Sequence, residues 1–369
     1  MAHQDNQIAI ARRDFVCVRL GQMNHVDVAR FEFDYDTTWT SFFLDADLNI
    51  YSRYGGRDDR VADSRMSRES LLETMSNVLS THRTVQQTPA DQRAAVIRTQ
   101  THPLFARPSQ PESIPLLKDN HEGCVHCHQV QEYRHLQAFH DGKFDRKLLF
   151  GYPLPENLGL TVTPQNGQLV KSIEPGSAVE FAGIKAGDVI RRINDIPIRS
   201  EYDIRWALHH APDGQPILLS VMRSTPRAGG ASANSVDLEL QLKPSATWRQ
   251  TDLGWRKSLR SVPLQLGFLG YTLGGEGLAQ AGFREGKSVL KVISLRPPGL
   301  AKNLQLQKGD LIVSVGGNTE FRTMDHFKSR LLERYRPGDT VKLEIIRDGR
   351  TILAEGLFPD WFTTENSVP

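Results

Sequence analysis

The second half of this chain repeats itself at a spacing of about 122 residues, and this repeat limits its possible folds more than any other feature. The residues Lys185–Ile190 (KAGDVI) correspond to Gln307–Ile312 (QKGDLI), and a predicted strand, helix and closing hairpin follow each of them. In the second copy, Asp348-Gly349 separates two apolar stretches, which is typical of a tight hairpin turn. The pattern predicts two copies of one small, β-rich domain.

Each copy resembles a bacterial PDZ domain. In the first copy Leu158-Gly159-Leu160 resembles the carboxylate-binding loop, and in the second Leu266-Gly267-Phe268 takes its place. The resemblance covers about residues 155–245 and 262–358. It implies that backbone N–H groups of these loops receive the terminal carboxylate of a partner peptide, while the extended peptide adds a strand to the sheet edge. The first copy matches more closely, so we expect it to bind more readily; the alternative is that the chain itself fills the grooves.

A second motif, Cys124-Val125-His126-Cys127-His128, has the C-x-x-C-H spacing of covalent haem attachment and holds two of the three cysteines in the chain. Thiols at this spacing reach both vinyl groups of one porphyrin, and the following histidine lies under the iron. We therefore predict haem c, with Cys124 and Cys127 as thioether anchors and His128 as the proximal ligand. The alternatives are a redox dithiol, a chance match, and a zinc site completed by nearby histidines such as His121.

The predicted haem leaves the second axial ligand undecided. No methionine lies between Met75 and Met222, which disfavours the His/Met ligation of small cytochromes c. Five-coordinate iron and a second histidine both remain open, and two of the candidates lie on a predicted helix over 131–150. The candidate ligands are His102, His121, His135 and His140.

A further histidine pair, His209-His210, lies on a predicted helix of the first repeat copy. Because adjacent helical positions point in different directions, we do not expect the two rings to share a metal ion, and we predict that both lie on the surface.

The amino-terminal region has a different pattern. Residues 15–20 and 39–44 are predicted strands from their β-branched and aromatic content, and 50–54 returns as a hairpin partner. Ser67 is a predicted cap of the helix that follows. This order resembles the carboxy-terminal half of a thioredoxin-like domain over about residues 8–85. The family's C-x-x-C helix and cis-proline have no counterpart here, so dithiol chemistry is not expected in this region.

Composition excludes two classes of protein. The net charge is +2 and no basic run is interleaved with aromatic residues, which excludes a nucleic-acid-binding protein. No stretch approaches the ~18 apolar residues that span a bilayer. Residues 1–8 lack the basic and apolar regions of a secretory signal. Because haem attachment of this type resembles an extracytoplasmic process, we expect a periplasmic or otherwise extracytoplasmic location. We also expect the true start of the protein to lie upstream of Met1. A selenocysteine codon read as a stop would lead to such a late start.

Together these features resemble a family of thioredoxin-like/PDZ (seleno)proteins. We expect a multidomain α+β chain with a partial thioredoxin-like α/β domain, a short helical C-x-x-C-H insert and two PDZ domains, each a partly open β-rich barrel with two helices. The expected boundaries are 1–88, 89–152, 153–246 and 255–360, with a tail over 361–369.

The predicted function is an extracytoplasmic electron-transfer adaptor, in which PDZ domains hold a partner's peptide or carboxy terminus near the haem and a redox partner protein exchanges electrons with it. The chain holds no G-x-S-x-G nucleophile segment, and we do not expect it to be an enzyme as written. One alternative is a non-catalytic peptide-binding scaffold whose C-x-x-C-H holds zinc or no cofactor. Another is a thiol-disulfide oxidoreductase, which requires a further upstream segment.

Overall fold

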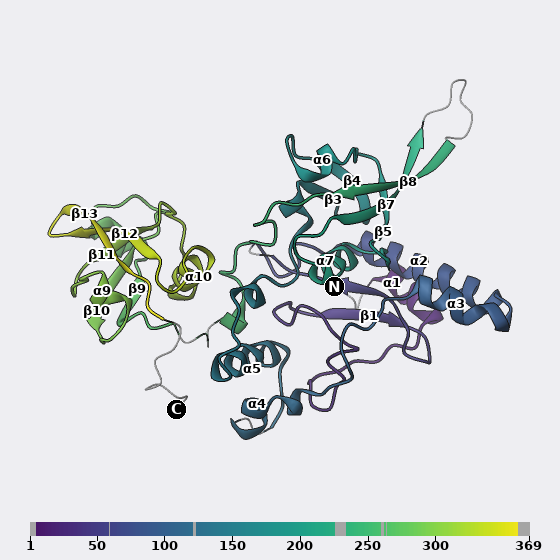
Figure 1. The fold of residues 1–369 in the computed structure, drawn as a ribbon, viewed down its shortest axis with the longest axis horizontal. Coiled ribbons are helices and arrows are strands. Elements are labelled where there is room, and N and C mark those ends of the chain that lie inside the picture. Colours follow the sequence, from purple (N-terminus) through teal and green to yellow (C-terminus); the bar gives the residue numbers. More distant parts are fainter. Residues whose placement is uncertain are drawn as a thin grey trace. The chain divides into compact units, whose positions relative to one another are not determined.

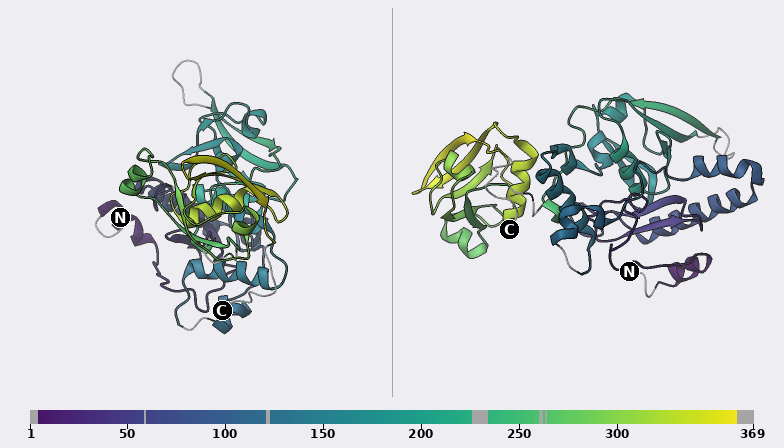
Figure 2. Two further views of the ribbon diagram at one scale, coloured as in Figure 1. Left: turned by 90° about the vertical axis from the view of Figure 1, so that its left-hand side faces the viewer. Right: turned by 60° about the horizontal axis from the view of Figure 1, so that its bottom comes forward.

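The computed structural model describes residues 5–58, 60–120, 123–225, 234–259, 262 and 264–360. The chain divides into two compact units (Figures 1 and 2). The first unit comprises Met1–Ser113, His121–Cys127 and Phe150–Thr251, and the second comprises Ile114–Asn120, His128–Leu149 and Asp252–Pro369. None of the helices in the described residues is both long and apolar enough to cross a bilayer.

The first unit begins with helices and a hairpin and ends with a β-rich domain. Its elements up to residue 113 are α1 (Asn6–Ala11), η1 (Arg12–Asp14), β1 (Thr40–Leu44), β2 (Ile50–Gly55), α2 (Arg68–Gln87), α3 (Ala90–Gln100) and η2 (Pro111–Ser113). The β-rich domain consists of η4 (Pro155–Leu158), β3 (Leu160–Thr163), β4 (Asn166–Ile173), α6 (Ala178–Phe181), β5 (Val189–Ile193), β6 (Ile196–Pro197), α7 (Glu201–His210), β7 (Ile217–Thr225) and β8 (Asn234–Leu242).

The second β-rich domain follows a similar order, with an additional helix, α8, between its first two strands. The stretch from residue 114 to residue 150 contributes α4 (Pro115–Asn120), α5 (Cys127–His140) and η3 (Arg146–Phe150). The domain itself consists of η5 (Lys257–Leu259), β9 (Phe268–Thr272), α8 (Gly275–Gln280), β10 (Leu290–Leu295), α9 (Leu300–Asn303), β11 (Leu311–Val315), α10 (Met324–Arg334), β12 (Thr340–Arg347) and β13 (Arg350–Leu357).

Both copies of the sequence repeat fold as antiparallel sheets, which confirms the repeat. The first sheet has the order β3-β4-β5-β7-β8, with β6 paired to β5, and the second has the order β13-β12-β11-β10-β9. In each sheet the strand after the glycine loop, β3 or β9, lies at an edge. The hairpin of β12 and β13 turns at Asp348 and Gly349, whose φ angles of 50° and 73° fit the predicted tight turn.

The repeated Gly-Asp dipeptide has the same structural role in both copies. Asp188 and Asp310 each accept a hydrogen bond at 2.8 Å from a backbone N–H at the start of their own turn. Each residue is 1% exposed, and each receives a two-pronged ion pair, with both N–O distances at 2.7 Å, from an arginine on the closing hairpin. The arginines are Arg223 and Arg347. The repeated dipeptide thus marks a buried turn that an ion pair connects to the closing hairpin of the same sheet.

In the amino-terminal region the predicted hairpin is confirmed and the predicted first strand is not. β1 and β2 pair antiparallel, and Ser67 caps α2 by accepting a hydrogen bond from the backbone N–H of Ser70 at 3.0 Å. Residues 15–20 form no strand, since Val16 and Val18 are 95% and 80% exposed and no sheet covers them. Among the described residues up to 113, β1 and β2 are the only strands, so the thioredoxin-like expectation finds no support.

The hairpin instead packs against α7 of the β-rich domain, and a buried polar network joins the two. Asp203 of α7 is fully buried and accepts hydrogen bonds from the Ser52 hydroxyl (2.7 Å) and from the backbone N–H groups of Arg53 (2.7 Å) and Arg199 (2.9 Å). Burial raises the pKa of Asp203 to about 6, against the effect of these hydrogen bonds. The Arg53 guanidinium lies 3.8 Å from the ring centre of Trp206. Residues 1–88 and 153–246, expected as separate domains, therefore lie in one compact unit.

Candidate peptide-binding sites

The loop before β9 has an unused backbone donor. Gly267 has a φ of 70°, and its carbonyl accepts a hydrogen bond from the backbone N–H of Arg296 at 2.7 Å. Within the part of the chain that the structure describes, the Gly267 N–H itself donates to no protein acceptor. A Cβ added here would lie 3.0 Å from the Pro298 carbonyl oxygen, so the loop conformation favours glycine. A carboxylate can accept from this N–H without breaking a hydrogen bond of the fold.

An open strand edge and an apolar cluster lie beside this loop. β9 is an edge strand, and its Leu269 and Tyr271 side chains are 39% and 50% exposed. Phe268, the first residue of the strand, packs edge-on against Phe327 of α10 with ring centroids 6.0 Å apart. Leu331, one turn further along α10, is buried in the same cluster. An extended peptide can therefore pair with β9 close to apolar side chains of the helix.

The corresponding loop of the first copy is closed on itself. Gly159 has a φ of 83°, and its N–H donates to the Glu156 carbonyl at 2.9 Å. A Cβ added at this position would lie 2.2 Å from the Cβ of Ser177. Leu158 and Leu160 are both buried. The predicted loop residues are present, but the glycine N–H is already used by the fold.

Arg65 bridges this first loop and helix α7. Its Nη1 atom lies 2.7 Å from Oε1 of Glu156, in the loop, and 3.5 Å from Oε1 of Glu201, the first residue of α7. Burial by itself would lower the pKa of Arg65, but the nearby carboxylates of Glu201, Glu156 and Asp58 raise it. Arg65 therefore stays charged in this buried position. All residues of α7 up to Leu208 are buried. Peptide binding at Leu158-Gly159-Leu160 stays a prediction, and it requires a peptide that fits beside these contacts.

The residues of the C-x-x-C-H motif are not all assigned to the same unit. Cys124 and Cys127 belong to the first unit and His128 to the second. Cys124 is exposed, and burial raises the pKa of the thiol of Cys127, which begins α5. The side-chain amide of Asn24 forms hydrogen bonds of 3.0 and 2.8 Å with the backbone on either side of Cys124. The Nδ1 atom of His128 lies 3.7 Å from a carboxylate oxygen of Glu132, one turn later in the helix.

The described candidates for the second haem ligand are held by other protein groups. His102 is buried with both ring nitrogens in hydrogen bonds, at 2.5 and 2.9 Å, and burial holds its pKa well below the usual value. His135 is buried and hydrogen-bonded at 2.8 Å to a glutamine one turn earlier. His140 lies 3.2 Å from the Asp141 carboxylate. His121 lies outside the described residues.

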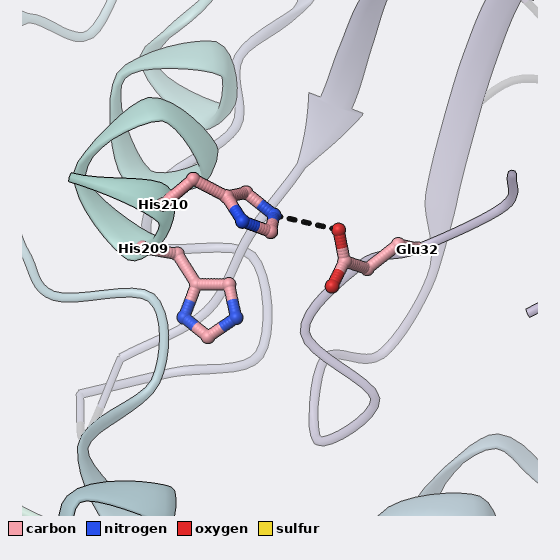
Figure 3. Close-up of side chains that lie close together, drawn as sticks. All are labelled: Glu32, His209 and His210. Atoms are coloured by element: carbon pink, nitrogen blue, oxygen red, sulfur yellow. Dashed lines mark hydrogen bonds and ion pairs between the residues drawn. The ribbon is translucent and has the colours of Figure 1, made fainter. Parts of the chain in front are cut away.

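Sequence reasoning missed one cluster, which consists of Glu32, His209 and His210 (Figure 3). One nitrogen or oxygen atom from each side chain lies within 4.8 Å of the others. α7 ends at His210, where the backbone of Ala211 becomes extended, and the two imidazole centroids are 4.8 Å apart. Neither histidine is exposed, contrary to the prediction of a surface pair. No local signal could have found Glu32, because it comes from a distant segment.

A comparison with known families assigns both β-rich parts. The family model described as the PDZ domain matches residues 157–242 and 277–355. The chain contains two PDZ domains. The prediction of two PDZ domains is thereby confirmed. The first match includes Leu158-Gly159-Leu160 and β3, whereas the second begins at residue 277, after Leu266-Gly267-Phe268 and β9, so the carboxylate-binding role of both loops stays a prediction.

Two relatives illustrate how much of the chain is shared with known proteins. The periplasmic serine endoprotease DegP of Salmonella typhimurium is 30% identical over 154 residues, which is 42% of this chain and 27% of the relative. DegP of Escherichia coli K12 is 38% identical over 82 residues, which is 22% of this chain and 16% of the relative. The chain therefore spans about a quarter of the length of these relatives, or less. The solved structure of the HtrA-type protease AlgW with a decapeptide shares 15% identity and covers 39% of this chain and 50% of that one, but its TM-score of 0.21 is too low to bear on the fold.

The predicted function and cofactor are wrong. The relatives that the comparison finds are serine endoproteases, not cytochromes or electron-transfer proteins, and the family match is to PDZ domains. This overturns the electron-transfer adaptor, its redox partner, the haem at Cys124, Cys127 and His128, and the zinc alternative at the same motif. The physical reason is that five residues specify a spacing of thiols and imidazole, whereas a haem site also needs an apolar cavity that distant segments supply.

Proposed function

We propose that this protein binds extended peptides with a free carboxy terminus, and that the second PDZ domain is the principal site. The observation that supports this proposal most strongly is the unused N–H of Gly267 next to the open edge of β9. In the first domain the equivalent N–H is bonded within the fold, and Arg65 joins the loop to α7. The first domain then serves mainly as the platform on which the amino-terminal region packs.

The binding mode follows from the backbone. The terminal carboxylate accepts a hydrogen bond from the N–H of Gly267. The peptide pairs with β9 as an added antiparallel strand, and its last side chain lies next to Phe268. A short peptide loses much conformational freedom when it is ordered along a strand edge, so we expect micromolar affinity, about 8 kcal/mol of binding free energy. Because the DegP relatives are periplasmic proteins, we also propose that this chain acts outside the cytoplasm.

The test is a screen of free-acid peptides against the full chain, followed by calorimetry on the best binder. Amidation of its carboxy terminus should weaken binding roughly 10- to 100-fold, because it removes a charge-assisted hydrogen bond worth about 1.5–3 kcal/mol. Gly267→Ala should have a similar effect, since the added Cβ forces the loop away from Pro298.

The matched control is Gly282→Ala, in the same domain. Gly282 has a φ of 79°, so alanine there meets the same backbone strain, but no atom lies within 4 Å of the added Cβ and the loop is undisturbed. We expect this variant to bind the peptide like the wild type. Equal affinity for acid and amide peptides would contradict the carboxylate site. Binding that survives Gly267→Ala, and that protects β3 rather than β9 from hydrogen exchange, would move the site to the first domain.

A further inference from the structure

We propose that Glu32, His209 and His210 form a binding site for a divalent transition-metal ion, which holds the amino-terminal region against the end of helix α7. The site is separate from both PDZ loops and from the cysteine motif, and it goes beyond the proposed peptide binding. Two imidazoles and one carboxylate form a ligand set that suits zinc, cobalt or nickel rather than magnesium or calcium. Three protein ligands also leave a coordination position for water.

The geometry brings the three ligands to one point. The Nε2 atom of His210 lies 2.7 Å from an oxygen of Glu32, and Figure 3 shows a ring nitrogen of His209 on the same side of the carboxylate. The side chains of His210 and Glu32 are 13% and 21% exposed, so an ion from solvent can reach them. The two adjacent histidines converge although they lie next to each other on α7, since their imidazole centroids are only 4.8 Å apart.

Neighbouring side chains hold each ligand in position. The indole N–H of Trp206 donates to Glu32 at 3.1 Å. The ring of Phe105 stacks on His210 with centroids 3.8 Å apart, and Tyr152 stacks on His209 with centroids 4.3 Å apart. Such outer contacts fix the orientation of ligating rings, so little side-chain freedom is lost when an ion binds.

Ion binding requires only small changes. Ligands on a tetrahedral ion with bonds of ~2.0–2.1 Å lie roughly 3.3 Å apart, so the ion replaces the hydrogen bond between His210 and Glu32 and widens this pair slightly. Ligation by the His209 nitrogen that faces Glu32 places the ring proton on Nδ1. That change breaks the contact between Nδ1 and the backbone N–H of Tyr152, which at 3.4 Å is already long for a hydrogen bond.

The test is a cobalt(II) titration of the chelator-treated full chain, carried in a Cys124→Ser/Cys127→Ser background so that no thiol of the motif competes. We expect one equivalent of cobalt, with a visible absorption spectrum of nitrogen and oxygen ligands and a rise in Tm with cobalt concentration. Glu32→Gln and His210→Gln should each weaken binding by about 10-fold or more. Glu32→Gln keeps an amide oxygen that accepts from Trp206, so circular dichroism of the variant should remain that of the wild type.

The matched control is His25→Gln, since His25 is a largely exposed histidine of the same unit. It should bind cobalt like the parent chain. The proposal is overturned if the parent chain binds no stoichiometric cobalt, or if the Glu32 and His210 variants bind it as tightly as the His25 variant. It is also overturned if the chain with intact Cys124 and Cys127 binds one equivalent and the double serine chain binds none.

Discussion

Replacing Asp203 by alanine should lower the free energy of unfolding of the first unit more than the replacement of an exposed aspartate does. The substitution removes the acceptor of three buried hydrogen bonds, from the Ser52 hydroxyl and from the backbone N–H groups of Arg53 and Arg199. Buried donors left without a partner each cost about 1–3 kcal/mol, but the loss of a buried carboxylate charge offsets part of this. We expect a net loss of about 3–5 kcal/mol in the free energy of unfolding. Ser52→Ala, which removes one bond, should cost about 1 kcal/mol.

The pH dependence of Asp203→Asn provides a second, signed test. The pKa of Asp203 is about 6 in the fold against 3.8 for the ordinary group, so at pH 5 the folded protein binds more protons than the unfolded chain. A raised pKa adds stability as the pH falls through 6, and the addition is complete below 3.8. From these two values the wild type should gain about 1 kcal/mol relative to Asp203→Asn between pH 7 and pH 5.

Urea unfolding followed by circular dichroism measures these differences, and hydrogen exchange by mass spectrometry assigns them to β2, to α7 or to the second unit. Asp237→Ala, which changes an exposed carboxylate on β8, serves as the control and should stay within about 0.5 kcal/mol of the wild type. If Asp203→Ala is equally mild, the network does not stabilise the unit. If β2 exchanges rapidly while α7 stays protected in the wild type, the hairpin and the PDZ domain are not one cooperative body.

Two further predictions concern single positions. Gly159→Ala should destabilise the first unit by more than about 2 kcal/mol, because the added Cβ would lie 2.2 Å from Ser177. Gly183 has a similar φ of 84° and no atom within 4 Å of the added Cβ, so Gly183→Ala should cost only about 1 kcal/mol. Equal decreases in Tm for the two variants would refute the steric argument. Burial by itself would raise the pKa of Asp252, but hydrogen bonds and Arg330 lower it to about 2. Its stabilisation of about 2 kcal/mol should therefore be present above pH 4 and vanish as the pH falls to 2, so that Asp252→Asn and the wild type converge in acid urea titrations.

The amino-acid sequence by itself determined the repeat, the closing hairpins and the helix cap at Ser67, because each depends on residues within a few positions of one another. Asp188 and Asp310 illustrate this, since each accepts a hydrogen bond from its own turn. The prediction of two PDZ domains is also confirmed. These features follow from backbone conformation and local hydrogen bonding, which a short window of sequence specifies.

Only the tertiary structure decided which of these local features is available to a ligand. The two glycine loops look alike in sequence, yet the N–H of Gly159 donates to the Glu156 carbonyl, while among the described residues the N–H of Gly267 has no protein acceptor. In the same way the C-x-x-C-H motif predicted a haem that its relatives do not support, and Glu32 met the two histidines at the end of α7 with no sequence signal. The physical reason is that burial and the meeting of distant side chains depend on which apolar faces pack together, and no local pattern fixes that choice.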